Sequence, residues 1–106
     1  MWNDKLTKAR AKMWEYQKRF DCYPDVNVAI NKDCWFNLSG PMIYFDMPDK
    51  LEQPFLHCHM EDYDLQRIVH RDLHWNNAEV GFRIMFNRVP NIYSPDTHTL
   101  LSFFHI

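Results

Sequence analysis

Glycine is nearly missing from this chain of 106 residues, which contains only Gly40 and Gly81. Long hydrophobic runs are also missing, because the uncharged apolar stretches fall far short of the roughly 20 residues that a membrane-spanning helix needs. The basic N-terminal stretch lacks the apolar segment of a secretory signal. Cys22, Cys34 and Cys58 show no Cys-x-x-Cys spacing, so neither a disulfide framework nor a thiolate zinc site is expected. These absences predict a soluble, non-secreted, cytoplasmic protein with reduced thiols.

The scarcity of glycine also decides how one motif is interpreted. Residues 70–77, His-Arg-Asp-Leu-His-Trp-Asn-Asn, resemble the catalytic loop of protein kinases, in which an aspartate accepts the substrate proton and an asparagine holds magnesium. The resemblance would give these roles to Asp72 and Asn77. A kinase also needs a glycine-rich loop, because glycine lets the backbone approach the nucleotide phosphates, and the two glycines here lie far apart. We therefore expect no kinase activity and no nucleotide binding.

The chain contains enough apolar residues to form one hydrophobic core. Hydrophobic residues make up 46% of it and aromatic residues 16%, beside 25% charged residues. No repeat, linker or low-complexity tract interrupts the sequence, which predicts a single domain over residues 1–106. Alanine and glycine are scarce while six His and four Trp are present, a usage compatible with a phage-type or a designed protein.

Apolar residues at spacings of three and four predict an N-terminal helix that starts near Asn3 or Asp4 and ends before Pro24. Its apolar stripe consists of Trp2, Leu6, Ala9, Met13, Tyr16 and Phe20. A second helix is predicted over residues 61–75, with an apolar stripe of Leu65, Ile68, Val69 and Leu73. Asp72 falls within this second stripe, so either the helix ends before it or its carboxylate is paired. The earlier end is the simpler interpretation.

Alternating apolar residues and turn signals predict six strands. They are Val26–Ile30, Cys34–Leu38, 42–47, 55–60, 80–86 and 99–106. The first two are expected to form a hairpin, because a turn signal separates them. Strands in series with short connections favour antiparallel pairing. The predicted fold is therefore a two-layer α+β domain, with an antiparallel sheet of about six strands covered by the N-terminal and mid-chain helices.

The first half of the chain carries another resemblance. After the predicted helix and hairpin come Trp35, Gly40-Pro41 and Tyr44, a W…G-P…Y pattern similar to that of ubiquitin-conjugating and RWD-type domains. The His-Pro-Asn stretch and the downstream catalytic cysteine of conjugating enzymes do not follow. The resemblance therefore implies a similar order of elements over this half of the chain.

Two pairs of histidines have spacings that place both imidazoles on one side of an element. His57 and His59 are two residues apart on a predicted strand, and His70 and His74 are four apart on a predicted helix. If the apolar sides of the two elements face each other, the pairs point to opposite sides of the molecule, so we expect no shared metal. Ordinary surface histidines are the leading interpretation, and no cofactor is expected. The alternatives are a two-histidine surface site and a metal-dependent or acid–base enzyme.

Other catalytic arrangements have little support in the sequence. Cys58 lies between two histidines on a predicted strand, where neighbouring side chains point to opposite faces and cannot form a nucleophile–base pair. The carboxylates of Glu61, Asp62 and Asp64 gather at a predicted helix start, where the helix dipole explains them. No catalytic residue is therefore predicted.

Charge is distributed unevenly along the chain, whose net charge is −2. Residues 1–20 hold six Lys or Arg against Asp4 and Glu15, a balance of +4, which leaves −6 for the remainder. The candidate binding surface on this helix is Lys5, Lys8, Arg10, Lys12, Trp14 and Lys18. Its leading interpretation is a solvated helix face, and the functional alternative is contact with an acidic protein. The net charge of −2 and the lack of a nucleic-acid motif disfavour contact with nucleic-acid phosphates.

The hypothesis that follows from the sequence is a small binding or regulatory module. It would act through contact with a protein partner, without catalysis of its own, and its partner and oligomeric state are open. The alternatives are the histidine-based enzyme and nucleic-acid binding through residues 1–20.

Overall fold

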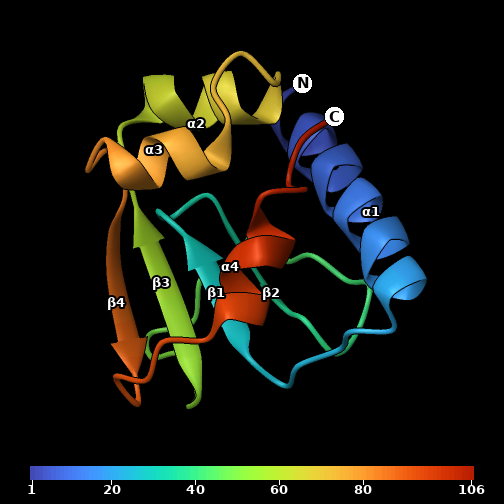
Figure 1. Ribbon diagram of the computed structural model, residues 1–106, viewed down its shortest axis with the longest axis vertical. Helices are drawn as coiled ribbons and strands as arrows, with labels where there is room; N and C mark the ends of the chain where they lie inside the picture. The colour runs from blue at the N-terminus through green and yellow to red at the C-terminus, as the bar shows by residue number, and fades with distance from the viewer.

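The computed structural model describes all residues from 1 to 106 and contains four helices and one four-stranded sheet (Figure 1). In chain order the elements are α1 (Trp2–Phe20), β1 (Asn27–Ile30), β2 (Cys34–Asn37), β3 (Phe55–His59), α2 (Asp62–Val69), α3 (Trp75–Val80), β4 (Met85–Val89) and α4 (Pro95–Leu101). They pack into one compact α+β globule with a radius of gyration of 12.5 Å. No helix combines the length and the apolar character needed to cross a membrane.

The sheet is mixed, with the strand order β2-β1-β3-β4. β1 and β2 form the predicted antiparallel hairpin, in which Ile30 lies opposite Cys34. On its other side β1 pairs in parallel with β3, and β3 pairs antiparallel with β4. The prediction of a wholly antiparallel sheet of about six strands is therefore wrong. The long connection 38–54 crosses over and returns the chain beside β1 in the same direction, as parallel pairing requires.

The helices surround one face of the sheet, and side chains from all four contribute to the core on that face. In Figure 1, α4 lies in front of the sheet, α1 along one side, and α2 and α3 above. Val28, Phe36 and Leu56 point from the strands into this core and are buried. The opposite face is partly covered by the irregular connection 38–54, whose Tyr44 stacks on Trp35 with ring centroids 4.6 Å apart. Helices therefore form only one of the two covering layers.

Helix α1 is confirmed, but its buried stripe is rotated relative to the prediction. Its buried residues are Leu6, Ala9, Arg10, Met13 and Gln17. Trp2 and Tyr16 are only half-buried, and Phe20 is 55% exposed, so the expected inward position of Phe20 is wrong. The rotation has a polar cause, because Gln17 donates from Nε2 to the carbonyls of Leu38 and Cys22, at 2.7 and 3.0 Å.

The predicted helix over residues 61–75 is divided into two. α2 ends at Val69, and Arg71 adopts a left-handed conformation with φ 68° that an α-helix cannot continue through. α3 then begins at Trp75, capped by His74, whose Nδ1 accepts a hydrogen bond from the backbone N–H of Asn76 at 3.1 Å. The early end inferred from Asp72 is confirmed, and the kinase-like residues 70–77 span this break.

Three of the six predicted strands are wrong or displaced. In 42–47 only Tyr44 pairs, through an isolated bridge to Trp35. The stretch 80–86 contains the end of α3 and a turn, so that β4 begins at Met85. Residues 99–106 are not a strand, because α4 starts earlier with Ser94 as its cap and Pro95 in its first turn. A short buried helix and a short buried strand have similar apolar runs, which explains the last error.

Candidate functional site

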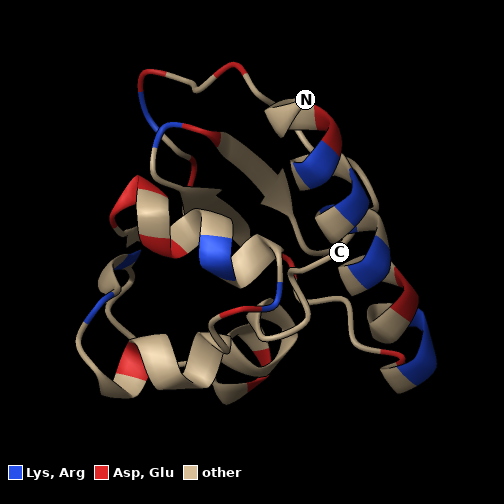
Figure 2. Ribbon diagram, turned by 90° about the horizontal axis from the view of Figure 1, so that it is seen from above, with Lys and Arg blue, Asp and Glu red and all other residues tan.

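Part of the predicted basic surface lies on the solvent-accessible side of α1. Figure 2 shows Lys and Arg recurring along this helix. Lys8 is exposed, and Lys5 and Lys12 are half-buried. The Nζ of Lys5 lies 3.2 Å from Nε2 of His70. Lys18 is on the other flank and pairs with Glu15 at 2.9 Å. These lysines remain a candidate surface for an acidic partner.

Arg10 is buried instead of facing outward, so its expected position is wrong. Its guanidinium donates to Gln17 Oε1 at 2.8 Å and to the backbone carbonyls of Asn37 and Met42 at 3.2 Å each, and also to the carbonyl of Gly40. Burial lowers the pKa of Arg10 to about 10. Arg10 therefore binds α1 to the end of β2 and the connection after it, which is a structural role.

Trp14, another residue of the candidate surface, is half-buried. Its ring lies 5.2 Å from that of Tyr23, and the guanidinium of Arg10 lies 5.7 Å from its centroid. Trp14 therefore forms a cation–aromatic contact with the buried Arg10, and neither residue is fully exposed as the candidate surface would require.

The four histidines singled out in the sequence do not come together. His57 and His59 are neighbours, with ring centroids 4.0 Å apart, and Nε2 of His57 lies 2.7 Å from the carbonyl oxygen of Asn31. Desolvation and the neighbouring His57 lower the pKa of His59. His70 and His74 lie on either side of the break between α2 and α3, so they do not share a helix face. No group of three or more His, Cys, Asp or Glu side chains is arranged to hold a metal ion.

The cysteines are free thiols in unreactive surroundings. Burial raises the pKa of Cys34 to about 12, and it raises the pKa of Cys58 as well, with Glu79 adding to the effect. Cys22 is half-buried, and desolvation together with Asp96 and Asp21 raises its pKa. A thiol that stays protonated is a poor nucleophile, so these residues do not form a nucleophilic site.

A cluster of exposed apolar side chains surrounds the turn between α3 and β4. We call Val80, Phe82 and Met85 the Phe82 patch; all three are exposed, and Phe82 is 91% exposed. Figure 1 places this turn at the outer side of the molecule, beside the edge strand β4. Large apolar side chains that gather at the surface often mark an interaction site.

The backbone at Phe82 is unusual for an aromatic residue. Phe82 has φ 57°, its N–H donates to the carbonyl of Glu79 at 3.1 Å, and the N–H of Arg83 donates to the carbonyl of Ala78 at 2.9 Å. This pattern closes a helix with a left-handed residue, usually glycine. Here Gly81 stands one position earlier, with an ordinary φ of −79°. A side chain in this conformation costs about 1–2 kcal/mol, and the exposed Phe82 ring gains little packing in return.

The two edges of the sheet differ in the same region. The edge of β2 is partly closed, since Trp35 and Tyr44 exchange two backbone hydrogen bonds of 2.9 Å. β4 forms the other edge, and no backbone hydrogen bond from elsewhere in the chain reaches its outer side. An unpaired edge is a template for another strand. Met85 belongs both to β4 and to the Phe82 patch, so the patch adjoins the open edge along the chain.

Sequence reasoning missed this surface because Val80, Phe82, Ile84 and Phe86 alternate like the inward residues of a strand. In the structure Ile84 is buried and Val80 and Phe82 are exposed, because the helix continues to Val80 before the chain turns. Gly81 was the available signal, since glycine is common where a helix ends.

No protein family matches the chain, and neither a curated protein nor a solved structure shows significant similarity to it.

Proposed function

We propose that the protein is a small binding module, without catalysis of its own, that recognises an extended segment of a partner protein along β4. The observation that supports the proposal is the exposure of the Phe82 ring, on a residue whose backbone conformation favours glycine. Neither its exposure nor its conformation stabilises the fold. Strained residues of this kind concentrate at functional sites.

The open edge of β4 supplies the second half of the interaction. An added strand would gain backbone hydrogen bonds from β4, while the Phe82 patch would receive an apolar side chain of the partner. Aromatic residues are frequent anchors in such interfaces. Arg83 follows directly and is about half exposed at its side chain, although it pairs with Asp64 at 3.4 Å. An acidic residue in the partner segment would meet this guanidinium.

The proposal is tested with peptides selected from a random display library against the protein. Selected peptides should alternate apolar and polar residues, and titration should shift the backbone amide signals of β4. Phe82→Gly should weaken their binding at least tenfold while raising the free energy of unfolding by about 1 kcal/mol, because glycine adopts the left-handed conformation without strain.

Asp21→Gly is the matched control. Asp21 ends α1 in the same left-handed conformation, with φ 50°, but contributes no side chain to the patch. Its replacement should leave peptide affinity unchanged. Selected peptides that bind Phe82→Gly as well as the unchanged protein would contradict the proposal. A dimer that forms in the absence of peptide and is lost in Phe82→Gly would identify a second copy of the chain as the occupant.

A further inference from the structure

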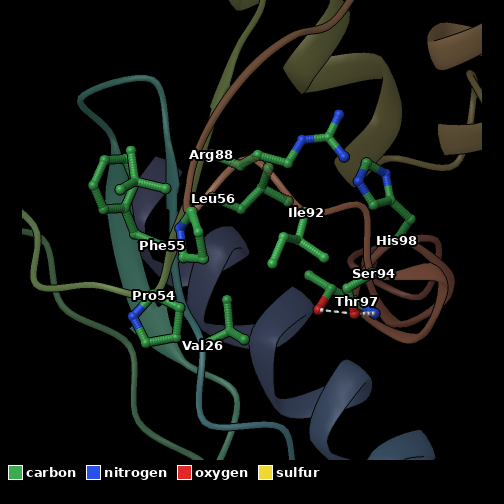
Figure 3. A pocket seen from close by; sticks show the side chains of 11 residues that line it. Val26, Pro54, Phe55, Leu56, Arg88, Ile92, Ser94, Thr97 and His98 are labelled. Carbon is green, nitrogen blue, oxygen red and sulfur yellow. Dashed lines mark hydrogen bonds between the residues drawn. The ribbon is translucent and has the colours of Figure 1, made fainter.

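A cleft of about 250 Å³ opens at the other end of β4, between the sheet and α4 (Figure 3). Its walls are mainly apolar and include Val26, Leu56, Val89 and Ile92. In Figure 3 the polar side chains of Arg88 and His98 lie toward one end of the cleft, and Val26 and Pro54 lie toward the other. This volume equals that of about eight water molecules in the liquid, which suits a small organic molecule.

His98 has a fixed orientation. It is only 7% exposed, and its Nδ1 lies 2.8 Å from Oε1 of Glu79, which also accepts a hydrogen bond of 2.5 Å from Nε1 of Trp75. The rings of Phe86 and Tyr93 flank the imidazole at 4.8 and 4.9 Å. Because a carboxylate can only accept, Nδ1 carries the proton of the neutral ring. The lone pair of the neutral imidazole is therefore on Nε2.

The Nε2 atom of His98 has no hydrogen-bond partner within the chain. No buried side-chain nitrogen or oxygen lacks a partner, so Nε2 is not sealed from solvent. His98 lines the cleft, where its ring lies beside the side chain of Arg88 (Figure 3). In the neutral tautomer, Nε2 is the ring nitrogen left free to accept a hydrogen bond from a ligand. A carboxylate that fixes the tautomer of a histidine in this way is common at sites where the other ring nitrogen acts on a ligand.

Arg88 supplies the complementary charge. It is half-buried, and no carboxylate lies within ion-pair distance of its guanidinium, which sits 5.5 Å from the ring centroid of Tyr93. No Asp or Glu lines the cleft. A half-buried guanidinium without a counter-ion can pair with a carboxylate in two hydrogen bonds, which lysine cannot do.

We propose that this cleft binds a small apolar 2-hydroxy acid. Arg88 pairs with the ligand carboxylate, Nε2 of His98 accepts a hydrogen bond from the ligand hydroxyl, and the apolar walls hold the hydrocarbon chain. Glu79 is a positioning residue, since it contacts His98 and fixes its tautomer. The site lies at the opposite end of β4 from the Phe82 patch, so neither proposal depends on the other.

The test compares three probes of equal chain length by titration followed in NMR spectra. They are 2-hydroxyhexanoate, hexanoate without the hydroxyl, and 2-hydroxyhexanamide without the charge. The hydroxy acid should bind at least tenfold more tightly than either of the others and should shift signals of Leu56, Ile92 and His98. The imidazole nitrogen signals of His98 should also show an unprotonated Nε2 in the free protein.

Two variants test which residue is responsible for each ligand preference. Arg88→Gln should abolish the preference for the acid over the amide, and His98→Gln should abolish the preference for the hydroxy acid over hexanoate. Arg83→Gln, outside the cleft, should change neither. If His98→Gln does not fold, the nitrogen signals of the unchanged protein still test its role. A protonated Nε2, equal binding of the three probes, or absence of saturable binding would overturn the proposal.

Discussion

Arg10 and Phe82 occupy positions that their side chains ordinarily avoid, one a charge inside and the other an aromatic ring outside. Arg10 is stable there because its donors meet three backbone carbonyls and Gln17, and because its plane lies over the ring of Phe36 at 4.7 Å. Phe82 has no comparable set of contacts. Arg10 is therefore held by contacts within the fold, whereas Phe82 is not, which is consistent with the partner contact proposed for it.

Replacing Arg10 by Lys should lower the free energy of unfolding by at least about 2 kcal/mol. The ammonium group keeps the charge but cannot reach all the acceptors of the planar guanidinium, so buried carbonyls lose their partners. Urea unfolding measures the change. Arg19→Lys, on the exposed side of the same helix, should change stability by no more than about 0.5 kcal/mol. Equal effects of the two substitutions would contradict the structural role of Arg10.

At the scale of elements, segments with a clear period and flanking turn signals could be predicted from the sequence, whereas boundaries set by tertiary packing could not. α1, the β1–β2 hairpin and β3 carry clear periods, and each is present. Asp72 indicated an earlier end for the mid-chain helix, but no residue type indicated the left-handed conformation of Arg71 at the break. The region of α4 was expected to be a strand because a short buried helix of seven residues has the same apolar run as a strand. His98 was not singled out, since its partner Glu79 is distant in sequence and meets it only through tertiary packing.

The rotation of α1 predicts different sensitivities for two apolar residues of its predicted stripe. Met13 is fully buried, so Met13→Ala should lower the free energy of unfolding by about 2–5 kcal/mol, as core truncations do. Phe20 is mostly exposed and meets only neighbouring rings such as that of Phe103, at 5.7 Å. Phe20→Ala should therefore cost about 1 kcal/mol or less. If equilibrium unfolding shows similar losses of stability for the two substitutions, the rotation of α1 is contradicted and the stripe predicted from the sequence is correct.

At the scale of the whole molecule, the sheet separates two kinds of cover, helices on one face and an irregular connection on the other. His59 lies on the face opposite the helices, while His105 packs near α1 and the break after α2. Burial lowers the pKa of both, with His57 adding to the effect on His59. Lys12, Arg71 and His74 face His105 and oppose its protonation, although a backbone hydrogen bond at Ile106 favours it. Both histidines therefore resist protonation in the folded state.

This resistance predicts that acid destabilises the fold. Because the folded pKa of each histidine lies below its unfolded value of 6.5, the unfolded chain binds more protons once the pH falls toward that value. The stabilisation is complete above pH 6.5 and is lost as the pH falls below it. Thermal unfolding between pH 7 and pH 5 should show this loss. The double variant His59→Gln, His105→Gln should lose less stability between pH 7 and pH 5. If its stability falls with pH as steeply as that of the unchanged protein, these two histidines are not the cause of the acid destabilisation.

The parallel pairing of β1 with β3 has a consequence for how quickly the chain finds its fold. The β1–β2 ladder closes over a short turn, and hairpins of that kind form within about 1–10 μs. The β1–β3 ladder can form only after the connection 38–54 has carried the chain past β1 to its other side, which costs a larger loss of chain entropy before any contact compensates it. The slow steps of folding are therefore expected to be the pairing of β3 with the preformed hairpin and its pairing with β4, which follows the still longer connection 60–84.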